Sequence, residues 1–180
     1  MITISFATMQ AALLCAAKKD IRPWAENILI TPQGDVVTTD GAILVTGKTS
    51  EGAPDKDYMF KLSLKPPVKY DYATVDTERN TVTFVHGDIQ SPIVAHVFDG
   101  TYAQWERITM TFKKADTVSV GFGTKYLTLM GKLSKLFGNA VLLETGQSNT
   151  HATRWTLNRL EPDTKSVIET VHVYLMPCRI

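Results

Sequence analysis

Three lysines at helical spacing form the pattern in this sequence that most clearly suggests a function. In "GTKYLTLMGKLSKLFG", residues 123–138, the polar residues Lys125, Thr128, Lys132 and Lys135 recur at intervals that return to one face of a helix. Ammonium groups in a row bind phosphates as point charges, without reading base sequence. Lysine is also common on solvated helix faces, and the spacing alone favours that simpler interpretation over a phosphate-binding surface.

A second basic cluster, Lys18, Lys19 and Arg22, follows the apolar stretch of "ATMQAALLCAAKK". Basic residues near the C-terminal end of a helix complement its dipole, which would explain this cluster without a ligand. The chain carries 19 Lys plus Arg against 18 Asp plus Glu, a net charge of +1. No global field therefore favours nucleic acid, and any such binding must come from local clusters.

Catalytic patterns are absent from the sequence. His86, His96, His151 and His172 are scattered, and no HExxH, GxSxG or P-loop occurs. Cys15 lies within an apolar helical stretch, which predicts an inert core thiol. We therefore predict that the protein is not an enzyme and uses no metal or cofactor.

The cysteine spacing and the hydropathy pattern suggest where the protein resides. The two cysteines, Cys15 and Cys178, form no CxxC motif, which is typical of a reducing compartment. No stretch is long and apolar enough for a membrane helix, and the N-terminus lacks the basic start of a secretory signal. These observations predict a cytoplasmic protein.

The alternation and turn residues predict three successive units in an α+β protein. The first has a strand, "ITISF", a helix over residues 7–19 capped by Thr8 and ended by Pro23, and the strands "NILIT", "VVTT" and "AILVTG". After the polar loop 49–57 come four strands, "YMFKLSL", "YDYATVD", "NTVTFVHG" and "SPIVAHVFDG", with no proper helix because Pro66 and Pro67 interrupt the intervening segment. The third unit has the strand "TVSVGF", the helix in 123–138, and the strands "NAVLLETG", "HATRWTLNRLE" and "VIETVHVYLM".

An internal repeat relates the first and third units. A shift of 116 positions lays "ISFATMQAALL" on "VGFGTKYLTLM", matching Phe6 with Phe122, Thr8 with Thr124 and Leu13 with Leu129. Both units then follow the order βαβββ. The match is short, and the alternative is two similar stretches that arose independently in one α+β chain.

Several motifs together resemble the bacterial sliding clamps, the β subunits of DNA polymerase III. The stretch "VSVGFGTKYLTLMGKLSKL" and the ending "VYLMPCRI" resemble the C-terminal part of those clamps, which end in Met-Pro-x-Arg-Leu; here Met176, Pro177, Cys178, Arg179 and Ile180 occupy those places. The segment "AALLCAAKKDIRPWAENILITPQGDVVTTDGAILV" is similar to their helix and following strands, and "FDGTYAQWERI" to the segment before a domain linker.

This chain departs from the clamp pattern in two ways. Clamp chains are longer, with three domains of two βαβββ units each, whereas this chain has three units. In addition, "TDGAILV" lacks the His-Arg that usually follows the glycine. A shortened, phage-type clamp would have these features, with a clamp-like domain at 1–112 (units 1–50 and 57–112) and a half-domain at 113–180.

The resemblance implies a ring around duplex DNA, with antiparallel sheets outside and helices on one face lining the hole. Twelve units per ring would require four of these chains. The basic residues on the two helices would then contact phosphates: Lys18, Lys19, Arg22, Lys125, Lys132 and Lys135. The resemblance thus reverses the preference for a merely solvated surface.

The resemblance also implies a hydrophobic pocket at the C-terminal tail for short linear motifs of polymerases and clamp loaders. Residues from the tail and the preceding linker would form it: Ile108, Met110, Tyr174, Leu175, Met176, Pro177, Arg179 and Ile180. The expected function is a homo-oligomeric processivity factor. Two alternatives remain open: a clamp-derived interaction module that does not encircle DNA, and an unrelated α+β oligomer with solvated lysines.

Overall fold

A computed structural model describes residues 1–112, 121–138, 141–146, 151–164 and 166–177. The chain divides into two compact units. Unit 1 comprises Met1–Asp40 and Thr46–Ala103, and unit 2 comprises Gly41–Val45 and Gln104–Ile180. The chain is α+β, as predicted, and each unit is described separately below.

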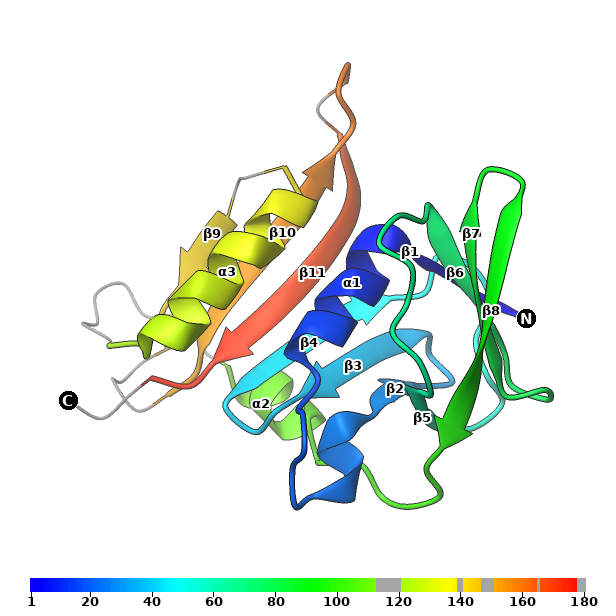
Figure 1. The fold of residues 1–180 in the computed structure, drawn as a ribbon. Helices are drawn as coiled ribbons and strands as arrows, with labels where there is room; N and C mark the ends of the chain where they lie inside the picture. Colours follow the sequence, from blue (N-terminus) through cyan, green and yellow to red (C-terminus); the bar gives the residue numbers. More distant parts are fainter. Residues whose placement is uncertain (113–120, 139–140, 147–150, 165, 178–180) are drawn as a thin grey trace. The chain divides into compact units, whose positions relative to one another are not determined.

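Unit 1 is an antiparallel sheet with one helix on its face (Figure 1). Its strands run in the order β1-β6-β7-β8-β5-β2-β3. The helix α1 (Phe6–Cys15) lies against β1, β3 and β6. The strand bounds are β1 (Ile2–Ser5), β2 (Ile28–Ile30), β3 (Asp35–Thr39), β5 (Tyr58–Leu62), β6 (Tyr72–Asp76), β7 (Thr81–His86) and β8 (Ile89–Val97), with β4 (Ile43–Lys48) reaching into unit 2.

The core of unit 1 lies between α1 and the sheet. Met9 and Ala12 of the helix pack in one cluster with Ile4 and Phe84 of the strands. Pairing of β1 with β6 places Ile4 opposite Ala73, so the inward-facing residues of both strands coincide. Cys15 is buried at the end of α1, where burial raises the pKa of its thiol to about 12. The predicted burial of Cys15 in the core is confirmed.

The first helix differs from its prediction at both ends. Ser5, not Thr8, is the N-cap, and its hydroxyl accepts from the Thr8 amide at 3.2 Å. The helix ends at Cys15, well before Pro23, because the Ala17 amide donates to the Ala25 carbonyl and leaves the helical pattern. Pro23 instead begins a 3₁₀ helix, Pro23–Glu26. Lys18, Lys19 and Arg22 therefore lie on the turn after α1, not on the helix.

The middle of the chain is entirely β, as predicted. Strands β5 to β8 follow one another without a helix, and β6 and β7 form a hairpin in which Asn80 has a φ of 50°. Tyr70, just before β6, fills the space beside α1: its ring meets Phe6 at 4.8 Å and Phe84 at 4.9 Å between centroids. This buried aromatic side chain thus links α1 to the sheet.

Unit 2 places one long helix, α3 (Thr124–Leu136), on a sheet of order β4-β11-β10-β9 (Figure 1). The helix follows its prediction closely, and Gly138 has a φ of 94°, the left-handed conformation expected of a terminator. The short helix α2 (Glu106–Thr111) was not predicted. Most of "TVSVGF" lies outside the described residues. The strands are β9 (Val141–Glu144), β10 (Thr153–Leu160) and β11 (Val167–Leu175).

Candidate functional site

The lysine row, which comprises Lys125, Lys132 and Lys135, lies on the solvent side of α3. All three side chains are exposed, whereas Met130 and Leu133 of the same helix are buried. The buried side lies against β10, where Leu157 is also fully buried. The apolar contact with the sheet therefore fixes the face of α3 that the lysines present to solvent.

The three members of the lysine row differ in their surroundings. The Lys125 ammonium lies over the Tyr126 ring, 5.0 Å from its centroid. In the described part of the chain, neither Lys132 nor Lys135 forms an ion pair. Two of the three ammonium groups are thus free to meet an anion without first breaking an existing pair.

The turn after α1 divides its three basic residues into two kinds. The Arg22 guanidinium donates from Nε and NH2 to the two carboxylate oxygens of Asp20, at 2.8 Å each. It also donates to the Asp40 carbonyl at 2.8 Å and lies over the Trp24 ring. This pairing holds the Asp20 pKa well below its usual range. Arg22 therefore stabilises the turn through these contacts, while Lys18 and Lys19 are exposed.

The tail residues divide between the core and the surface. Tyr174 and Leu175 end β11 and are buried, with Leu175 fully covered. Met176 follows with its amide donating to the Ala42 carbonyl at 3.1 Å and 42% of its surface exposed. Pro177 is partly exposed, and Arg179 and Ile180 lie outside the described residues. Only Met176 and Pro177 of the described tail residues can offer a ligand an accessible surface in this conformation.

The two linker residues lie on α2. Ile108 is half-buried and Met110 is 82% exposed. The next residue after the helix, Phe112, packs its ring against Tyr174 at 5.9 Å between centroids. The structure therefore joins the end of α2 to the last strand through Phe112, a residue that the sequence analysis did not identify.

The sequence analysis also did not identify an ion pair beside Tyr174. Arg154 lies opposite Glu144 in the register of β10 and β9, and its Nε donates to Glu144 Oε2 at 2.7 Å. The guanidinium also lies over the Phe112 ring, 4.8 Å from its centroid. The pKa of Arg154 is raised, because its hydrogen bonds to Glu144 and Tyr174 outweigh the effect of its partial burial. The pair depends on the register of β9 and β10, which the sequence alone does not indicate.

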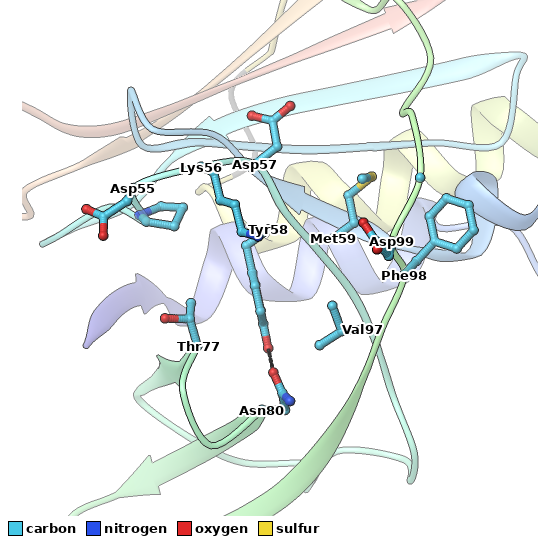
Figure 2. Close-up of a pocket in the computed structure, with 12 residues that line it drawn as sticks. Asp55, Lys56, Asp57, Tyr58, Met59, Thr77, Asn80, Val97, Phe98 and Asp99 are labelled. Carbon is cyan, nitrogen blue, oxygen red and sulfur yellow. Dashed lines mark hydrogen bonds between the residues drawn. The ribbon is translucent and has the colours of Figure 1, made fainter.

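A hollow of about 770 Å³ in unit 1 lies apart from all of these residues (Figure 2). Met59, Val97 and Phe98 form its apolar side, and the Tyr58 hydroxyl donates to Asn80 Oδ1 at 3.2 Å. Its acidic residues are Asp55, Asp57 and Asp99, against the single cation of Lys56. This charge disfavours phosphate, so the hollow does not extend the basic surfaces.

Within the described ranges, no group of three His, Cys, Asp or Glu side chains could hold a metal ion. No helix there has both the length and the apolar character needed to cross a bilayer.

Comparison with known proteins identifies the fold. No protein-family model and no curated protein matches the sequence. Among solved structures, a Helicobacter pylori beta clamp in complex with diflunisal matches with a TM-score of 0.62 and 10% identity, over 99% of this chain and 66% of that chain. A DNA polymerase sliding clamp from Pseudomonas aeruginosa gives 0.57 and 13%, over 99% and 67%, and Caulobacter crescentus pol III beta gives 0.53 and 9%, over 98% and 65%.

The chain spans about two thirds of the length of these clamps. At such low sequence identity the similarity establishes the fold and leaves the function to be argued from the residues. This chain has the fold of the bacterial DNA polymerase III beta sliding clamps.

Proposed function

We propose that this protein is a sliding-clamp-like processivity factor, which assembles into a homo-oligomeric ring around duplex DNA. The observation that carries the proposal is α3: an amphipathic helix on a clamp-fold sheet, with its lysine row directed to solvent. Point charges of this kind hold a phosphate backbone without fixing a position on it, which sliding requires. A net charge of only +1 limits binding through the remaining surface.

The same proposal divides the chain into a clamp-like domain, residues 1–112, and a half-domain, residues 113–180. With three βαβββ-type units per chain, four chains would supply the twelve units of a clamp ring. Light scattering tests the assembly, and the expected mass is four times that of the 20.0 kDa chain. A monomeric mass at the concentrations that bind DNA would refute the ring.

Encirclement has its own test. The protein is bound to nicked circular duplex, the complex is washed, and one half is cut with a restriction enzyme. A ring should stay on the circle and leave after linearisation, because only a free end releases it. Equal retention on circular and linearised DNA would instead support an interaction module that binds DNA or its partners without encircling DNA.

The tail is proposed as the docking surface for short hydrophobic motifs of a polymerase or clamp loader. Met176 supports this role because it is exposed beside a buried strand end and has a flexible, polarizable side chain. Met176→Glu should reduce processive primer extension without changing assembly, because a carboxylate opposes the burial of an apolar motif. Ile168→Glu is a matched control, since Ile168 is also exposed on β11 but lies at the start of the strand, far along it from Met176.

A further inference from the structure

The segment between β5 and β6 lies beside α1 on the same face of the sheet (Figure 1). Tyr70 holds the end of this segment, with its ring edge-on to Phe6 at 4.8 Å and its hydroxyl donating to Gln10 Oε1 at 3.5 Å. Ser63 and Leu64 form a bend, and Pro66 and Pro67 restrict the backbone that follows and prevent a helix there. A non-helical segment therefore lies beside α1 and is held there by Tyr70.

A basic groove of about 430 Å³ lies where this segment meets the end of α1. Lys18 and Lys19 line it from the turn after α1, and Lys61 and Lys65 line it from β5 and the segment that follows. Glu26 is the single carboxylate among its lining residues. We call these four lysines the lysine groove; with Glu26 they leave a formal charge of +3.

Glu26 is already engaged and organises the groove. Its Oε1 accepts from the Asp20 amide at 3.1 Å, and its Oε2 accepts from the Lys61 ammonium at 2.9 Å. These contacts, led by the Lys61 hydrogen bond, lower the pKa of Glu26, so it stays ionised. Lys18, Lys19 and Lys65 form no ion pair in the part of the chain that the structure describes.

Lys19 supplies a second, independent observation. Its φ is 56°, a left-handed conformation in which glycine or asparagine is less strained than lysine. Backbone strain of this kind is concentrated at functional positions, because the surrounding structure must maintain it. Lys19 lines the groove with an exposed side chain, and lysine at this position carries a backbone strain that glycine or asparagine would reduce.

We infer that the lysine groove binds backbone phosphates of duplex DNA, as a second contact surface separate from the lysine row of α3. The inference rests on the proposed function for its choice of ligand and adds residues that the sequence did not indicate, Lys61 and Lys65. Lysine ammonium groups suit this role because they contact phosphates independently of sequence. Glu26 and Lys61 act as positioning residues, and Lys18, Lys19 and Lys65 carry the free charges.

The test compares two double variants of the full chain that lose the same charge. Lys18→Gln with Lys65→Gln removes two unpaired lysines of the groove, whereas Lys48→Gln with Lys56→Gln removes two lysines of unit 1 outside it. Each variant is titrated with a short linear duplex over a range of salt concentrations. Loss of two phosphate contacts should reduce the slope of the logarithm of the binding constant against the logarithm of the salt concentration by about 1.8. Binding at about 0.1 M salt should weaken roughly 60-fold.

A third variant, Lys19→Asn, tests the strained position itself. Asparagine tolerates the left-handed conformation and carries no charge, so the turn should persist while the salt slope falls by about 0.9. Melting temperatures of the two double variants should match that of the wild type, since the replaced side chains are exposed, and that of Lys19→Asn should be equal or higher because asparagine is less strained there. Unchanged binding in the groove variants, or an equal loss in the control, would overturn the inference.

The two proposals fail in different ways. If wild-type protein binds linear duplex with a steep salt dependence but is not retained on nicked circles, encirclement fails and the lysine groove stands. If circles retain the protein and the groove variants bind as the wild type does, the groove fails and encirclement stands. If the wild type does not bind linear duplex even at low salt, the lysine groove is refuted directly.

Discussion

The ion pair between Arg154 and Glu144 should control how firmly the end of β11 is held. Arg154 donates to Glu144 across the β9–β10 pair and covers Phe112, which in turn packs on Tyr174. The side chains are only 31% and 11% exposed, so both charges are largely removed from water. Arg154→Met would remove the ion-pair partner that Arg154 provides to the largely buried Glu144 carboxylate.

The expected magnitude follows from this burial. Removing one partner of a fully buried pair costs about 3 to 5 kcal/mol, and the partial exposure of Arg154 reduces this to about 2 to 4 kcal/mol. Replacing both partners, Arg154→Met with Glu144→Leu, removes the Glu144 charge together with its partner. The double variant should therefore unfold within about 1 kcal/mol of the wild type.

Urea unfolding followed by circular dichroism measures these differences, and the two single variants complete a double-mutant cycle. Trp155, next to Arg154, offers a local fluorescence signal, because its indole donates to Thr153 Oγ1 at 3.1 Å. Arg154→Lys is the matched control, since it keeps the charge but not the paired geometry. If the double variant is as unstable as Arg154→Met, then loss of the Arg154 partner of Glu144 does not explain the instability, and the prediction is refuted.

Three further predictions concern other parts of the chain. Leu133→Ala should lower the free energy of unfolding by about 2 to 5 kcal/mol in urea, because Leu133 is fully buried, whereas Lys132→Ala should change it by about 0.5 kcal/mol or less. Lys19→Gly should raise the melting temperature, through a gain of about 0.5 to 1 kcal/mol from relieved strain, and Lys18→Gly should not. Burial, and then Arg154, lower the pKa of His172 against the opposing effect of Glu144. The unfolded chain therefore takes up the proton first as pH falls below 6.5, and stability measured down to about pH 5 should decline with a slope that His172→Gln removes.

The sequence predicted the parts of the fold that depend on local periodicity. The apolar residues of 123–138 fall on one helical face, and Gly138 has the left-handed φ expected of a terminator, so α3 was predicted almost to its ends. Alternating segments likewise predicted the strands. The capping error at Thr8 is of the same local kind, because Ser5, three residues earlier, takes the N-cap position and its hydroxyl accepts from the Thr8 amide.

Features that depend on distant contacts were not predicted. The end of α1 at Cys15 is set by Ala25, whose carbonyl accepts from the Ala17 amide, and no local residue marks that position. The helix α2 is only six residues long and has no side-chain cap, so it carries no usable signal. The pairing of Lys61 with Glu26 joins residues 35 apart in sequence, which explains why the lysine groove was not foreseen.

The residues between β5 and β8 present a basic surface without a helix. A helix presents lysines through its period, as α3 does with Lys132 and Lys135. The segment after β5 achieves a similar result by other means: Tyr70 anchors one end, the prolines limit its conformations, and Glu26 fixes Lys61 at its start. Because phosphate binding requires charge at a given place and not a helical backbone, the proposed DNA contact by this segment does not need a helix.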